Sequence, residues 1–171
     1  VWTRERQWEP LWDDIVLQAD EIIIEQSERN HFMGAAVISR VKTMGKQVDA
    51  MDIIDGQQRL TTLQILLVTL RDFVKATSYD AELETELRRL TLNDGRMEDE
   101  IESFKVWPTN SDREIFETVV KAESLYAVEQ HYPIPPRQGR AKPKQRHALV
   151  EAYVYFYNAI HDYVMINVDG S

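Results

Sequence analysis

The chain has 171 residues, of which 43% are hydrophobic, and these values predict one globular domain with a substantial core. Its 29 acidic and 20 basic residues give a formal net charge of −9, which disfavours DNA binding by the surface as a whole. Because cysteine is absent, disulfides, thiolate nucleophiles and cysteine zinc sites are excluded. No apolar run approaches the roughly 20 residues of a membrane span and no signal peptide is visible, so we expect a cytoplasmic protein with no membrane partner.

The first predicted element is an amphipathic helix between Gln7 and Glu28, where apolar residues recur at spacings of three and four. Trp8 and Trp12 lie one turn apart on its apolar side. Two aromatic residues on such a face are more often core than a surface that stacks on a base, and we interpret them as core.

Two β-rich runs, 35–41 and 48–54, flank a turn containing Gly45 and predict a hairpin. The second run ends at Asp55-Gly56 and leads directly into a predicted helix over 57–74 with one apolar stripe. Gly56 stands at the turn, where a side chain would hinder a sharp bend or the close approach of a ligand. Asp49 and Asp52 flank the second run; a metal role with Asp55 is an alternative to the favoured interpretation of a solvent-facing edge.

The start of this helix is a candidate anion site, because its free N–H groups and dipole favour negative charge. Two interpretations of Arg59 follow. Asp55 can cap the helix and pair with Arg59, or the guanidinium can grip a phosphate with two hydrogen bonds. From spacing alone, the pair with Asp55 is favoured.

The run from Asp55 to Leu63, with the sequence DGQQRLTTL, resembles the motif of the N-terminal domain of GmrSD-type modification-dependent restriction endonucleases. Two other segments are similar to that family: residues 2–15, which end in Leu-Trp-Asp-Asp-Ile, and residues 32–37, which contain a glycine. The resemblance is strong over the first half of the chain and weak over the rest. It implies a single ParB/sulfiredoxin-like α+β domain over residues 1–171, helix-rich, with a small mixed β-sheet packed against several helices.

The resemblance also implies a function. The expected activity is nucleotide binding and hydrolysis in a regulatory domain of a DNA restriction (phage-defence) system, with GTP, ATP or CTP and Mg²⁺. The catalytic residues implied are Asp55, Gln57, Gln58 and Arg59, with Asp55 also as a metal ligand. The nucleotide- or phosphate-binding residues implied are Gly56, Gln57, Arg59, Thr61, Thr62, Asn110 and Arg113.

Three alternatives stay open. The first is a ParB-like switch that binds a nucleotide or a DNA phosphate and dimerises without turnover. The second is purely structural, with Asp55 and Arg59 bracing the strand–helix corner of an assembly module. The third, a sulfiredoxin-like reductase, is the weakest because the chain has no cysteine.

The partners expected from the resemblance are a C-terminal or separate His-Asn-His nuclease domain, modified DNA indirectly, and a second copy in a homodimer. This chain has four scattered histidines and no His-Asn-His pattern, so we expect no nuclease activity from it alone. The family begins with a Tyr-Gln-Arg segment before its first Trp, whereas this chain starts at Val1-Trp2. We therefore expect a fragment that lacks this segment and a nuclease domain.

The second half of the chain predicts a strand over 101–107 and a capping box at Ser111–Glu114 that opens a helix. A capping box explains Asp112 and Arg113 without a ligand.

Residues 133–143 read as a flexible loop, followed by a closing helix over 149–164. Three contacts are open for a basic run in and after this loop: DNA, the acidic surface of the domain, or solvent alone. Solvent alone is the commonest case for such a run. Its members are Arg137, Arg140, Lys142, Lys144 and Arg146.

Overall fold

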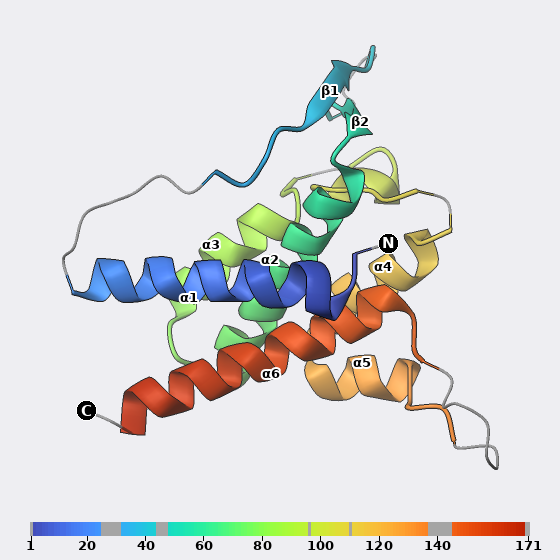
Figure 1. Cartoon of the computed structure of the whole chain (residues 1–171). Helices are drawn as coiled ribbons and strands as arrows, with labels where there is room; N and C mark the ends of the chain where they lie inside the picture. Colours follow the sequence, from blue (N-terminus) through green and yellow to red (C-terminus); the bar gives the residue numbers. More distant parts are fainter. Residues whose placement is uncertain are drawn as a thin grey trace.

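The structure is a computed structural model that describes residues 2–24, 32–43, 48–95, 97–109, 111–136 and 145–169, with the backbone alone for residues 168 and 169. Helices dominate it (Figure 1). The elements are η1 (Arg4–Trp8), α1 (Glu9–Ile23), β1 (Val37–Arg40), β2 (Met51–Asp55), α2 (Gln57–Thr77), α3 (Ala81–Thr91), η2 (Glu100–Ser103), α4 (Arg113–Ala122), α5 (Leu125–His131) and α6 (Ala148–Asp169). Within the described ranges, no helix is long and apolar enough to cross a membrane.

The core lies where α2 packs against α3 and α6, and where α4 and α5 pack against α6. On α6, Val150, Tyr153, Phe156 and Ile160 recur at spacings of three and four and are buried, which is the stripe expected of a helix that faces a core. This confirms the predicted closing helix. Trp8 is buried as well, which confirms its predicted place in the core. Trp8 packs against Tyr155, with ring centroids 6.2 Å apart.

Strands β1 and β2 form an antiparallel ribbon, in which Ile38 pairs with Ile53 and Arg40 with Met51. This confirms the hairpin. All four residues of β1 and all but Ile53 of β2 are exposed, and Figure 1 shows the ribbon extending beyond the helices at the end where α2 begins. The expected mixed sheet of three strands packed on helices is therefore wrong for the described residues. The ParB/sulfiredoxin-like topology stays a prediction.

The predicted strand over 101–107 is replaced by η2 and a single bridge between Leu92 and Phe104. Phe104 is buried, and its ring lies 4.9 Å from that of Trp107 and 6.1 Å from that of Phe116. Burying these aromatic rings places the segment against the helical core, which explains why it does not extend the ribbon.

The predicted capping box at Ser111–Glu114 is also wrong. Helix α4 begins at Arg113 after Asp112, which has helical backbone angles and makes no side-chain cap; the Ser111 hydroxyl donates to the Asp112 carboxylate over 3.0 Å. The same type of pattern, an acceptor followed three residues later by Glu, forms a capping box at Asp99 and Glu102 instead.

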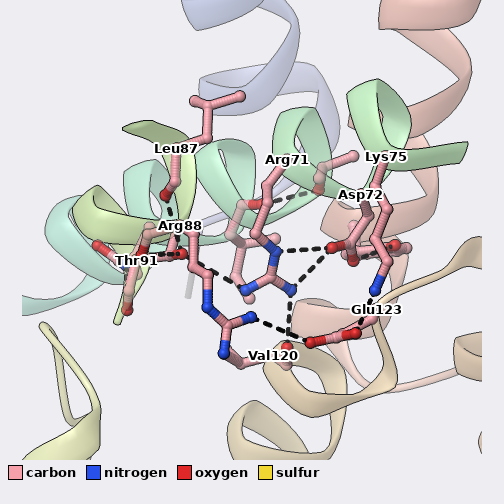
Figure 2. Close-up of polar contacts among 12 residues, drawn as sticks. Arg71, Asp72, Lys75, Leu87, Arg88, Thr91, Val120 and Glu123 are labelled. Carbon is pink, nitrogen blue, oxygen red and sulfur yellow. Dashed lines mark hydrogen bonds and ion pairs between the residues drawn. The ribbon is translucent and has the colours of Figure 1, made fainter. Parts of the chain in front are cut away.

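A buried polar cluster joins α2 to α3, α4 and α6 (Figure 2). Arg71 and Asp72 on α2 are 2% and 0% exposed. The Arg71 guanidinium donates to the Asp72 carboxylate and to the Val120 carbonyl, each over 2.8 Å, and the Tyr153 hydroxyl donates to the other Asp72 oxygen over 2.8 Å. Burial raises the pKa of Asp72, and Arg71 partly offsets this.

Candidate functional site

The corner between β2 and α2 is closed by two glycines and an arginine. Gly56, the residue before α2, has a φ of 93°, which favours glycine. A Cβ at Gly56 would lie 3.4 Å from the Cβ of Ala36, so the corner rests on the segment that leads into β1. Arg59 Nη1 donates to the Ala35 carbonyl over 2.8 Å, and a Cβ at Gly34 would come within 2.4 Å of the same atom.

These contacts change the interpretation of Arg59. Asp55 does not cap α2, and no ion pair joins Asp55 to Arg59 in the described part of the chain. The guanidinium instead holds the 34–35 backbone against the start of α2. The favoured pair between Asp55 and Arg59 is therefore wrong.

A cavity of about 180 Å³ opens on another side of the same helix start. Gln57, Gln58, Thr61 and Thr62 line it together, because residues spaced by four lie on one helical face. Its other lining residues come from the start of the chain, from the segment before α4 and from the start of α6. They are Trp2, Trp8, Pro108, Thr109, Asp112, His147, Ala148, Leu149 and Ala152.

Three helices thus begin beside this cavity: α2, α4 and α6. Helices α2 and α4 have no side-chain cap. By contrast, α3 and α5, which begin elsewhere, are capped by the side chains of Asp80 and Ser124. Uncapped N–H groups and the positive end of a helix dipole favour a bound anion, so the starts of α2 and α4 make this cavity a candidate anion site.

The motif side chains at the cavity are not equally available. Gln57 Nε2 donates to the Ile53 carbonyl over 2.6 Å, and the Thr61 hydroxyl donates to the Gln57 carbonyl over 2.9 Å. These bonds brace the strand–helix corner. Gln58 is exposed and has no side-chain hydrogen bond to any described residue, so its amide is free to meet a ligand.

A second, larger hollow of about 820 Å³ lies between the ribbon and residues 93–109. It shares Gln57, Thr61, Pro108 and Thr109 with the first cavity, so the two adjoin. Arg113 lines this hollow; its Nε donates to the Pro108 carbonyl over 3.1 Å and its guanidinium lies 5.7 Å from the centre of the Trp107 ring.

The predicted site residues therefore fall into two groups. Gln57, Gln58, Thr61, Thr62 and Arg113 line the two hollows, whereas Asp55, Gly56 and Arg59 line neither. Asn110 lies outside the described residues.

Asp112 is the one carboxylate among the described residues that line the smaller cavity. Its Oδ1 lies 3.5 Å from His147 Nε2. No group of three or more His, Cys, Asp or Glu residues in the described ranges forms a metal cluster. Mg²⁺ commonly binds through one or two carboxylates together with substrate phosphates, and Asp112 fits that pattern.

Sequence reasoning missed His147 and Trp2. The four histidines are far apart in the chain, and His147 reaches the cavity only because α6 begins there. For Trp2, the Trp-containing run at the start of the chain was an available signal.

The basic residue Arg146 is 8% exposed at its side chain and pairs with Glu151 over 2.8 Å, so it contacts the acidic surface of the domain. The other four residues of the basic run lie outside the described residues.

Comparison with protein families gives a match over residues 1–170 to the family described as GmrSD restriction endonuclease, N-terminal domain. Comparison with curated proteins gives no match. The family match agrees with the DGQQR motif and covers both hollows.

Proposed function

Because this chain belongs to the family of GmrSD restriction endonuclease N-terminal domains, we propose that it binds and hydrolyses a nucleoside triphosphate and thereby regulates a nuclease domain of the same restriction system. The observation that carries this proposal is the cavity at which α2, α4 and α6 begin. From the DGQQRLTTL segment, Gln57, Gln58, Thr61 and Thr62 line it. Helix N-termini are effective phosphate sites, and those of α2 and α4, which have no side-chain cap, both lie beside this cavity.

The two adjoining hollows suit the two parts of a nucleotide. The phosphates would occupy the smaller cavity, over the uncapped start of α2 and beside Gln58. The nucleoside would extend past Thr61 and Thr109 into the larger hollow, whose wall includes the Arg113 guanidinium packed over the Trp107 ring.

Mg²⁺, when bound with the nucleotide, would neutralise phosphate charge. Asp112 would hold it, since this carboxylate lines the cavity whereas Asp55 does not. The Gln58 amide, which is exposed and unbonded among the described residues, would orient the attacking water, as amides do in other triphosphatases. Arg59 would act indirectly, by fixing the corner that carries the motif.

The wider role follows from the family. Nucleotide turnover, or the sensing of modified DNA, would control a His-Asn-His nuclease domain attached to this one or carried by a partner. Any contact of this chain with DNA would be indirect or local, because its net charge is −9.

The test is phosphate release from the Mg²⁺ complexes of GTP, ATP and CTP, compared among the original chain, Gln58→Ala and Arg59→Ala. We expect release by the original chain and a loss in both variants, with Gln130→Ala on α5 as a remote control. Release that is unchanged in Gln58→Ala and Arg59→Ala would remove the basis of the proposal. Stoichiometric binding without release would favour the non-hydrolysing switch.

A further inference from the structure

The α6 side of the cavity carries an imidazole that lies far from the motif in sequence. His147 directly precedes α6, and its side chain is 35% exposed. Its Nδ1 accepts the backbone N–H of Leu149 over 3.3 Å. An acceptor nitrogen carries no proton, so in the neutral ring the proton belongs to Nε2.

This Nε2–H has no hydrogen bond to a described residue. Its nearest charged neighbour is Asp112 Oδ1 at 3.5 Å, and no hydrogen bond joins the two. Asp112 itself already accepts from the Ser111 hydroxyl over 3.0 Å. His147 and Asp112 both line the cavity, so the donor stands beside the space that a ligand would occupy.

The charge of the lining makes this donor important. Among the described residues, no Lys or Arg side chain lines the smaller cavity, and Asp112 contributes a negative charge. An anion there depends on the helix amides and on neutral donors, of which Gln58 stands at the α2 side and His147 at the α6 side.

We infer that His147 is a ligand-binding residue of this site, which donates from Nε2 to a phosphate oxygen of the nucleotide. This inference rests on the proposed function and adds a residue to its binding site. The ligand would thus be held between the starts of α2 and α6.

His147 also caps α6, and the two roles can be separated by substitution. Asn is among the best N-cap residues but lacks a donor at the position of Nε2. We therefore expect His147→Asn to keep the melting temperature near that of the original chain, and His147→Ala to lower it. Both variants should bind a nucleoside triphosphate about ten- to a hundred-fold more weakly, the loss expected for one hydrogen bond to a charged group.

The experiment is calorimetric titration of the Mg²⁺ complexes of GTP, ATP and CTP into these variants and the original chain. Ser124→Ala, which removes the cap of α5 away from the cavity, should lower the melting temperature without changing the Kd. Weakened binding in His147→Asn with an unchanged melting temperature supports the inference. Full affinity in His147→Asn overturns it and leaves the proposed function intact, whereas no binding by the original chain overturns both.

Discussion

The guanidinium of Arg59 occupies the space where a side chain of residue 34 would have to stand: a Cβ at Gly34 would lie 2.4 Å from Arg59 Nη1. Two segments of the family resemblance, the glycine-containing run at 32–37 and the DGQQR motif, are thus in direct contact. The contact orients the start of α2, from which the cavity is built.

Gly34→Ala should destabilise the domain in two ways, since Gly34 has a φ of 89° and the new methyl group displaces Arg59 from the Ala35 carbonyl. Gly95 is a matched control, because its φ is 111° but a Cβ there meets nothing within 4 Å. In urea denaturation we expect Gly34→Ala to cost about 1 kcal/mol more than Gly95→Ala, the usual value of one hydrogen bond. The excess should disappear in an Arg59→Ala background; if it persists there, the contact with Arg59 is not its cause.

Asp55 and Arg59 should behave independently. Because they form no ion pair, a double-mutant cycle between Asp55→Ala and Arg59→Ala should give a coupling energy below about 0.2 kcal/mol. Arg59→Ala alone should cost roughly 1 kcal/mol through its lost hydrogen bond. A coupling of 0.5 kcal/mol or more, on the order measured for ion pairs, would restore the pairing inferred from sequence.

How far the sequence predicted the fold differs from element to element. The start of α2 at Gln57 was predicted, because a strand followed by Asp-Gly and an apolar stripe are local signals. The segment around Phe104 was not, because β-rich composition cannot show that its rings are buried against Phe116. The capping-box pattern occurs near both Asp99 and Ser111, and only backbone geometry decides which one forms.

In the candidate site, too, some residues are grouped by a local sequence pattern and others are brought together only by the fold. Gln57, Gln58, Thr61 and Thr62 share a face by helical periodicity, which the sequence contains. The position of His147 depends on how α6 packs, over a separation of about ninety residues from the motif. No local pattern could have joined them.

Tyr153→Phe should destabilise the domain, because it removes the hydrogen bond to the buried Asp72 carboxylate. Leaving a buried acceptor short of a donor costs roughly 1–3 kcal/mol. Tyr157→Phe is the control, since Tyr157 lies one turn further along α6, stacks on Tyr153, and has no hydroxyl hydrogen bond to a described residue. Equal unfolding free energies for the two variants would contradict the account of this cluster.

Glu123 should contribute stability that depends on pH. The hydrogen bond from Lys75 lowers the pKa of Glu123 in the folded chain, and Arg88 acts in the same direction. A lowered pKa gives stability that is present above the ordinary pKa of glutamate and is lost as the pH falls through the folded value. The stability difference between the original chain and Glu123→Gln should therefore be largest near pH 7 and shrink towards about pH 3.

The control for this titration is Glu86→Gln on α3, because Glu86 is exposed and has no ion pair with a described residue. Its effect on stability should be small at every pH. A difference for Glu123→Gln that stays constant from pH 7 to pH 3 would show that the ion pairs with Lys75 and Arg88 do not stabilise the fold.

Calorimetric titration of Mg²⁺–GTP, –ATP and –CTP into Gln58→Glu tests most directly whether the cavity beside Gln58 binds the phosphates of a nucleotide. Gln58 is exposed in the first turn of α2, where a negative charge is favourable to the helix, so the variant should fold normally. The added carboxylate should repel phosphate and abolish binding that the original chain and the remote control Gln130→Glu both show. Binding of equal strength in Gln58→Glu would contradict the proposed phosphate site.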